Sequence, residues 1–187
     1  PAHLFEVIAQ PFRLDLFWRL HRSHPPRAQA VRPPMKDPQS YGWANEHPPS
    51  VSDVKTDSLR ISLPRHDIEI DCLMKGDGHP VVMLHGMGGG AADWSRNEYW
   101  FAGRGFRVFA PDLPGHGRSD SPPTGWNVRN MSRLAVDILD ALGLESATLV
   151  GHSASGMFAA HAALHYPERL DALVLVAPSG IQCSVGW

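Results

Sequence analysis

The sequence predicts an α/β fold built on a mostly parallel, doubly wound sheet. Two segments with alternating apolar and polar residues come first, within residues 59–74, and continuous apolar runs then alternate with helical patterns. Alternation is typical of strands with one exposed face, whereas continuous apolar runs are typical of parallel strands covered on both faces. Strands that alternate with helices favour parallel pairing through right-handed crossovers. A sharp strand–turn–helix junction at Ser153 is the third observation, because open α/β sheets place their sites at such strand ends.

Residues 1–51 are predicted to form a Pro-rich N-terminal extension to a domain over residues 52–187. Prolines recur throughout residues 24–50, where aliphatic residues are sparse. That composition is typical of an extended or disordered linker, because it offers little apolar surface to bury.

The segment before this linker, residues 12–20, permits two interpretations. Its apolar and charged residues alternate as in a strand, yet Pro11 suits the first position of a helix. Basic residues beside Phe17 and Trp18 would suit a helix that attaches to a membrane surface. A short element that packs on the main domain is the interpretation we prefer.

The domain itself is predicted to open with two half-buried strands, Leu59–Leu63 and Ile68–Met74. The apolar run Val81–Leu84 is the first strand expected to be covered on both faces. A glycine-rich loop leads from it to a helix around residues 91–102, and Phe106–Ala110 is the next strand.

The later elements continue the alternation of helix and strand. Asn127 is predicted to cap a helix with apolar residues at i, i+3, i+4 and i+7 spacings, and Gly143 ends it. The strand Ala147–Val150 leads through a sharp turn into a largely apolar helix over residues 154–166. Leu173–Ala177 is predicted to be another strand covered on both faces.

The sharp turn has the composition of a serine nucleophile elbow, GHSASG at residues 151–156. Such a turn is so tight that the positions two before and two after the serine must be small, and here they are Gly151 and Ser155. The helix that begins after Ser153 directs unpaired N–H groups and the positive end of its dipole at the hydroxyl. Negative charge on a substrate oxygen would be stabilised there, most directly by the N–H of Ala154.

Two further loops follow strands and complete a recognisable set with the elbow. They are HGMGGG at residues 85–90 and DLPGHGRS at residues 112–119. In this order and spacing, the three loops closely resemble those of the α/β-hydrolase family, and the resemblance covers roughly residues 57–180.

The resemblance implies a serine hydrolase that acts on carboxylic esters or related acyl small molecules, with no cofactor. Ser153 would attack the carbonyl carbon and form an acyl-enzyme, and the N–H groups of Met87 and Ala154 would form the oxyanion hole. The residues implied to shape these loops are His85, Gly86, Gly151 and Asp112.

A triad cannot be completed from this sequence. The family places its acid and its histidine after the serine, yet the later His161 and His165 lie on the elbow's own helix and point away from the hydroxyl. His116 is expected two strand positions away, at roughly 10 Å, which favours a structural role. We therefore expect the chain to be the amino-terminal portion of a hydrolase, truncated after about its sixth strand. Alone, these 187 residues are expected to hydrolyse simple esters negligibly.

Other functions share parts of these motifs. An α/β-hydrolase with the same elbow can hydrolyse C–C bonds, act as a cofactor-free haloperoxidase, or bind ligands without catalysis. Gly86-x-Gly88-x-x-Ala91 followed by Asp112 also has the outline of a dinucleotide-binding fingerprint. We disfavour that interpretation because two amphipathic strands precede it and it leaves the elbow unexplained.

Composition excludes several function classes. With 17 basic and 19 acidic residues, the net charge of −2 gives no basic footprint for nucleic acid. Cys72 and Cys183 are too few for a disulfide framework and lack the spacing of metal ligands. No apolar run approaches the roughly 20 residues that span a bilayer, and the N-terminus lacks the layout of a secretory signal. We expect a cytoplasmic protein without a bound metal.

Overall fold

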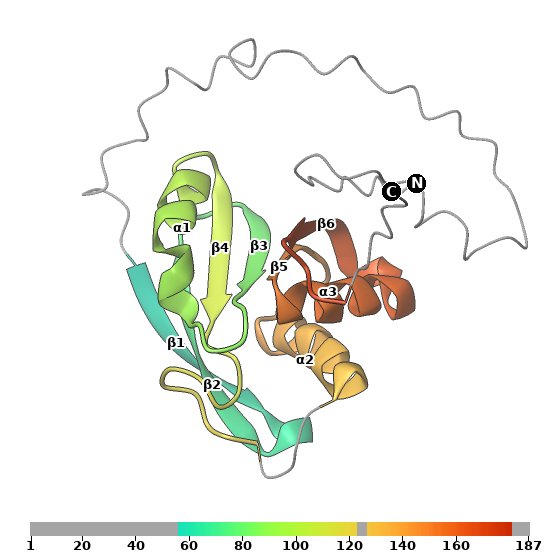
Figure 1. Cartoon of the computed structure of the whole chain (residues 1–187). Coiled ribbons are helices and arrows are strands. Elements are labelled where there is room, and N and C mark those ends of the chain that lie inside the picture. Colours follow the sequence, from blue (N-terminus) through green and yellow to red (C-terminus); the bar gives the residue numbers. More distant parts are fainter. Residues whose placement is uncertain (1–55, 123–126, 181–187) are drawn as a thin grey trace, which may run out of the picture.

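The computed structural model describes residues 56–122 and 127–180 (Figure 1). The predicted extension, its linker and the two interpretations of residues 12–20 therefore lie outside the described residues, as does the boundary at residue 52. The strands in chain order are β1 (Thr56–Leu63), β2 (Ile68–Lys75), β3 (His79–Leu84), β4 (Phe106–Pro111), β5 (Ala147–His152) and β6 (Leu170–Val176). The α-helices are α1 (Ser95–Ala102), α2 (Val128–Ala141) and α3 (Ala154–His165), with short 3-10 turns at Pro64–His66, Ala91–Trp94 and Pro167–Arg169.

One sheet joins all six described strands in the order β1-β2-β4-β3-β5-β6. The pairs β1–β2 and β2–β4 are antiparallel, whereas β4, β3, β5 and β6 run parallel to one another. The prediction of two leading antiparallel strands followed by a parallel sheet is therefore confirmed. The strand β4 lies two places from β5, as expected for the loop that carries His116.

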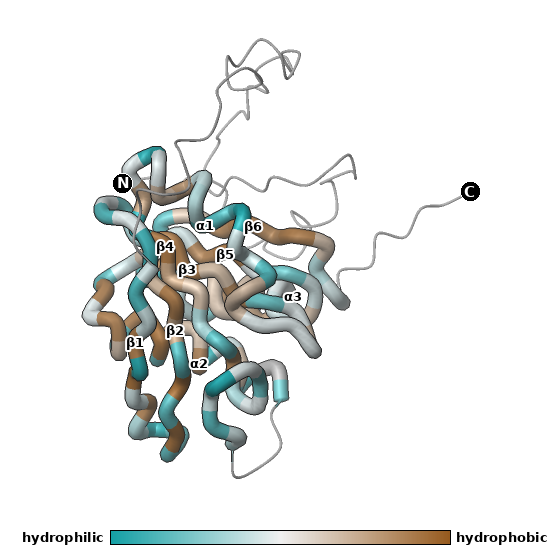
Figure 2. The backbone as a smooth tube through the Cα atoms, turned by 90° about the vertical axis from the view of Figure 1, so that its left-hand side faces the viewer, coloured by the Kyte–Doolittle hydropathy of each residue, from teal (hydrophilic) through white to brown (hydrophobic). Residues whose placement is uncertain are grey.

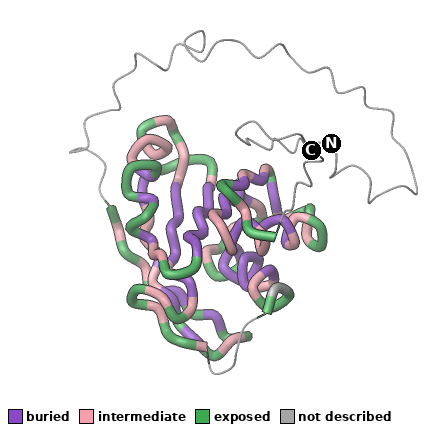
Figure 3. Tube along the Cα trace, in the orientation of Figure 1, coloured by how far each residue is buried: buried purple, intermediate pink, exposed green. Residues whose placement is uncertain are grey.

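Helices cover both faces of the sheet. Alternate residues of β3 point to opposite faces: Val82 packs in the same cluster as residues of α2 and α3, and Met83 in the same cluster as Trp94. Figure 1 shows α1 beside β4, well apart from α2 and α3. The buried residues follow the central strands (Figure 3), and the tube of β1 alternates between hydrophobic and hydrophilic residues (Figure 2). The doubly wound arrangement follows from these two separate apolar clusters.

The predicted caps of the helix after Asn127 are both present. The Asn127 side-chain oxygen accepts a hydrogen bond from the N–H of Asn130 at 3.1 Å. At the other end Gly143 has a φ of 68°, and the N–H of Leu144 returns to the carbonyl of Leu139 at 2.9 Å. This left-handed turn supplies a hydrogen-bond donor to a carbonyl at the end of α2, as a glycine after a helix commonly does.

The strand β6 differs from its prediction, because only one of its faces is fully covered. Leu173 and Leu175 are buried in the cluster shared with α3. On the opposite face Val174 is half-buried against the cluster that contains Trp94, and Val176 is 39% exposed. The prediction of two covered faces for Leu173–Ala177 is therefore wrong for the part of the chain that the structure describes.

An ion pair lies buried where β2 ends against α1. The Lys75 side chain is fully buried, and its Nζ atom lies 3.9 Å from Glu98 Oε1 and 3.1 Å from the centroid of the Tyr99 ring. Neither Lys75 Nζ nor Glu98 Oε2 has a hydrogen-bond partner in the described residues. Burial raises the pKa of Glu98, and the charge of Lys75 opposes that rise. Two charged groups are thus held in a small apolar space by each other and by one aromatic face.

Among the described helices, none is long and apolar enough to cross a bilayer.

Candidate active site

Ser153 lies at the junction of β5 and α3, in a backbone conformation that L-residues rarely adopt. Its φ is 53° and its ψ is −119°. Such conformations cost on the order of 1–3 kcal/mol and persist only where the surroundings enforce them. The sharp turn predicted from the sequence is therefore present, and the hydroxyl is carried at its apex.

The small residues around Ser153 are sterically required. A Cβ atom at Gly151 would lie 2.6 Å from the carbonyl oxygen of Ser155 and 2.8 Å from the Cα atom of Gly156. At Gly156 a Cβ atom would lie 2.7 Å from the Cβ of Pro178. Glycine at these two positions lets the strand, the helix and the following loop approach one another.

Ser155 stands where many elbows have a second glycine, and its side chain forms a buried hydrogen bond. Its side chain is buried, and its hydroxyl donates to the backbone carbonyl of His85 at 2.5 Å. This hydrogen bond joins the first turn of α3 to the loop that follows β3. The departure from the glycine pattern therefore links two parts of the candidate site.

His85 shapes the loop after β3. It is fully buried, its Nδ1 donates to the carbonyl of Gly86 at 2.7 Å, and its Nε2 accepts from the N–H of Leu113 at 2.9 Å. Burial lowers the pKa of His85, which agrees with a neutral ring that donates through one nitrogen and accepts through the other. Both nitrogens are engaged within these two loops, which agrees with the loop-shaping role expected of His85.

The loop after β3 also touches the elbow directly. A Cβ atom at Gly86 would lie 2.9 Å from His152 Nδ1 and 3.1 Å from Ser153 Cβ. The next residue, Met87, has a side chain that is 82% exposed. Among the described residues, no hydrogen bond engages the N–H group of Met87 or of Ala154. These two residues directly follow Gly86 and Ser153, which meet here, and the role of their N–H groups as an oxyanion hole stays a prediction.

Asp112 joins its own loop, at the end of β4, to the loop after β3. Its carboxylate accepts from the N–H of Ala91 at 2.7 Å and from the N–H of Arg118 at 3.2 Å. A Cβ atom at Gly117 would lie 2.0 Å from Asp112 Oδ2, so only glycine fits against the carboxylate. These contacts agree with the loop-shaping role expected of Asp112.

His116 contacts the β3 loop instead of Ser153. Its Nε2 accepts from the N–H of Gly88 at 3.1 Å, and its Nδ1 donates to the carbonyl of Pro114 at 3.1 Å. Its ring also lies edge-on to that of His85, with centroids 4.9 Å apart. These contacts agree with the structural role predicted for His116, because both of its ring nitrogens already have hydrogen-bond partners.

The other described histidines near the elbow make ring contacts. His152 lies edge-on to Trp94, and His161 and His165 pack against each other on α3 with ring centroids 4.2 Å apart. In the described part of the chain, the hydrogen-bond partner of Ser153 Oγ is Ser179 Oγ, at 3.3 Å. Ser179 is not among the site residues predicted from the sequence. Its place after an apolar strand puts it at the same sheet edge as the three loops, but the left-handed turn at Ala177 that brings it to Ser153 has no signal in the sequence.

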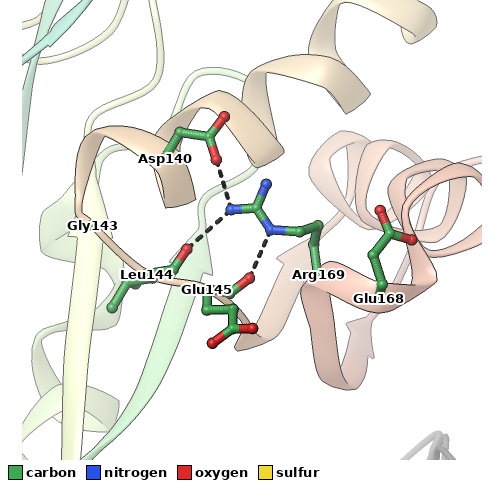
Figure 4. Close-up of a pocket in the computed structure, with 6 residues that line it drawn as sticks. All are labelled: Asp140, Gly143, Leu144, Glu145, Glu168 and Arg169. Atoms are coloured by element: carbon green, nitrogen blue, oxygen red, sulfur yellow. Dashed lines mark hydrogen bonds and ion pairs between the residues drawn. The ribbon is translucent and has the colours of Figure 1, made fainter.

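Two hollows of the described surface are lined by residues other than Ser153. One of about 560 Å³ is lined by the loops before β5 and β6, at the opposite edge of the sheet (Figure 4). There the Arg169 guanidinium donates to the carbonyls of Leu144 and Glu145 and pairs with Asp140 at 2.7 Å, so it is already occupied. A second hollow, of about 300 Å³, lies beside Asp112. No three His, Cys, Asp or Glu side chains converge as metal ligands within residues 56–122 and 127–180.

Comparison with known proteins gives a consistent result. Residues 79–187 match the model of the family described as the alpha/beta hydrolase fold. A 2-hydroxy-6-oxo-6-phenylhexa-2,4-dienoate hydrolase from Burkholderia cepacia is 41% identical over 114 residues, which make up 59% of this chain and 40% of that protein. The chain spans less than half the length of the curated relatives it matches.

Solved structures share the fold over about two thirds of this chain. A haloalkane dehalogenase from Agrobacterium tumefaciens aligns with a TM-score of 0.61 at 27% identity, over 68% of this chain and 43% of its own. An esterase from Exiguobacterium antarcticum aligns with a TM-score of 0.60 at 27% identity, over 65% of this chain and 45% of its own. The family match, the mixed sheet and the strained serine turn together show that this chain belongs to the α/β-hydrolase family.

Proposed function

We propose that this protein is a serine hydrolase that attacks a carbonyl carbon through Ser153. The observation that carries the proposal is the strained turn that presents the Ser153 hydroxyl at the start of α3. The N–H groups of Met87 and Ala154 are proposed as the oxyanion hole beside it. A serine in this setting is poised for nucleophilic attack, because charge that develops on the carbonyl oxygen meets fixed dipoles.

In the proposed reaction Ser153 Oγ forms a bond to the carbonyl carbon while its proton passes to a base. The tetrahedral oxyanion is held by the N–H groups of Met87 and Ala154, and its collapse releases the leaving group with that proton. Water then hydrolyses the acyl-enzyme and restores the hydroxyl. The proposal takes the base and its acid from outside the described residues, since the ring nitrogens of His85 and His116 have other hydrogen-bond partners and the described partner of Ser153 Oγ is Ser179.

The chemistry of a serine nucleophile narrows the range of substrates. Attack on an sp³ carbon, as in a haloalkane or an epoxide, would leave Ser153 as an ether that water does not readily hydrolyse. Attack on a carbonyl leaves an ester that water does hydrolyse. We therefore propose carboxylic esters or related acyl compounds as substrates, in preference to the haloalkanes of the structural neighbour named above.

A second candidate is hydrolysis of a C–C bond next to a ketone. It is favoured by two relatives, 41% and 42% identical, that are named 2-hydroxy-6-oxo-6-phenylhexa-2,4-dienoate hydrolases. The same attack by Ser153 would serve, with a stabilised carbanion as the leaving group that takes up the proton. The two candidates differ in the leaving group and share the nucleophile.

Labelling with a fluorophosphonate probe tests the nucleophile. We expect the product of the complete reading frame to be labelled at Ser153 and the Ser153→Ala variant to be unlabelled, because the probe bonds to an activated serine. The 187 residues alone should be labelled far more weakly, since no described base contacts Ser153 Oγ. A Ser146→Ala variant is the matched control, because its hydroxyl bonds to Asp171 at the other end of β5 and β6.

Labelling that persists in Ser153→Ala would refute the assignment of the nucleophile. If the wild-type protein is labelled, turnover of a 4-nitrophenyl ester and of 2-hydroxy-6-oxo-6-phenylhexa-2,4-dienoate distinguishes the two candidate reactions. Absence of labelling in every protein would favour a binding protein over an enzyme.

A further inference from the structure

The segment that follows β6, Ala177–Gly180, is bound to the backbone of the elbow. The N–H of Ser153 donates to the carbonyl of Val176 at 3.0 Å, and the carbonyl of Ser153 accepts from the N–H of Ser179 at 2.9 Å. Both polar backbone groups of the strained serine are therefore engaged by the end of β6 and its following loop. Pro178 packs against Gly156, which adds an apolar contact to these two hydrogen bonds.

The path of this segment brings one side chain to the nucleophile. Ala177 has a φ of 43°, an unusual value for a residue with a Cβ atom, and it turns the chain back toward α3. Ser179 follows the turn, and its Oγ lies 3.3 Å from Ser153 Oγ. The backbone hydrogen bond from Ser179 to Ser153 places the two residues side by side, so a short side chain is enough to bring the hydroxyls together.

We propose that Ser179 is a positioning residue that donates a hydrogen bond to the Ser153 oxygen and holds it in the rotamer required for attack. The inference rests on the proposed nucleophilic role of Ser153. A hydroxyl has one proton to donate and two lone pairs that accept. Ser153 gives its proton to the base, so in the hydrogen bond between the two hydroxyls Ser179 is the donor and Ser153 the acceptor.

The long separation of the two oxygens fits a contact that tightens during reaction. Hydrogen bonds in sites without substrate are often long and shorten in the reacting complex. As the proton leaves Ser153, its oxygen gains negative charge and becomes a stronger acceptor for Ser179. The donor then keeps the nucleophile directed between the N–H groups of Met87 and Ala154.

The test compares Ser179→Ala and Ser179→Thr in the product of the complete reading frame, with Ser146→Ala as the control. The maximal rate of fluorophosphonate labelling (kinact) and the concentration for half that rate (KI) are measured together with the thermal midpoint. We expect Ser179→Ala to lower kinact about 2- to 10-fold, the equivalent of one neutral hydrogen bond, with KI and the thermal midpoint unchanged. Ser179→Thr, which keeps the hydroxyl, should restore the wild-type kinact, and Ser146→Ala should not alter it.

Each outcome decides between the two proposals. If wild-type protein is labelled at Ser153 but Ser179→Ala has the wild-type kinact, or Ser179→Thr is as slow as Ser179→Ala, the positioning role is overturned and the nucleophile stands. The positioning role is also overturned if Ser179→Ala is labelled more slowly only because KI is higher, or because the thermal midpoint is lower. If wild-type protein is not labelled, both proposals fail.

Discussion

Replacement of Lys75 by Met should lower the free energy of unfolding by about 3–5 kcal/mol, although Lys75 is not among the residues proposed to take part in catalysis. The substitution keeps the apolar stem but removes the charge, so it leaves the Glu98 carboxylate, 5% exposed, without its partner. An isolated buried charge loses its hydration and gains nothing in exchange. The Lys75→Met substitution also removes the cation that lies over the Tyr99 ring. Equilibrium unfolding in urea measures the effect.

The double variant Lys75→Met/Glu98→Leu is the matched control. Replacing both members of a buried ion pair by apolar residues is often neutral or stabilising, so the double variant should recover most of the lost stability. Equal stability of Lys75→Met and the wild-type protein near neutral pH would contradict this account of the pair.

The loss in Lys75→Met should also depend on pH. Burial raises the pKa of Glu98 in the folded protein, and without Lys75 nothing opposes that rise. In the unfolded chain the pKa stays near its ordinary value of 4.5. The folded protein then binds the proton more tightly, so the variant is most stable below this value and loses stability as the pH rises through the folded-state pKa.

Gly151→Ala should lower the rate at which Ser153 is labelled by about 100-fold or more. The new Cβ atom would meet backbone atoms of Ser155 and Gly156 at 2.6 and 2.8 Å, and backbone cannot rotate away as a side chain does. The strand and the helix must separate, and a displacement of about 1 Å at a reacting group costs on the order of 100-fold in rate. The labelling rate per folded molecule of the complete protein measures the effect.

Gly143→Ala controls for the general cost of placing alanine where glycine stands. Gly143 has a φ of 68° and no atom within 4 Å of the added Cβ, so the variant should lose only about 1–2 kcal/mol of stability. Its labelling rate should equal that of the wild-type protein. A Gly151→Ala variant that is labelled within about tenfold of the wild-type rate would show that the elbow tolerates a wider turn than its contacts indicate.

The local features of the fold were predictable because each depends on neighbouring residues. Asn127 and Gly143 set the two ends of α2 through hydrogen bonds that involve residues close to them in the sequence. The elbow was predictable for the same reason, since a strand, a small residue and a helix follow one another directly around Ser153. The three loops at the carboxyl ends of β3, β4 and β5 are brought to one edge by the parallel sheet itself.

Features that depend on distant contacts were not predictable. Lys75 ends a strand in the sequence like any exposed lysine, and only the packing of α1 shows that Glu98 and Tyr99 enclose it. The approach of Ser179 to Ser153 depends on a left-handed turn at Ala177, where alanine gives no signal of that conformation. The bond from Ser155 to the carbonyl of His85 likewise joins two segments that no local pattern connects.

The order of the strands also has a consequence for how the polypeptide reaches this structure. The hairpin of β1 and β2 pairs residues that are close in the chain, such as Leu63 with Ile68, so little loop entropy is lost when it closes. The central strand β3 pairs Val81 with Thr148 across all of β4 and α2, so this pairing has a high contact order and closes slowly. We therefore expect the hairpin to gain protection early in refolding, while the turn at Ser153 forms only when β5 docks beside β3. Until that step the strained serine has no neighbours to enforce its conformation, and competence for labelling should appear among the last events of folding.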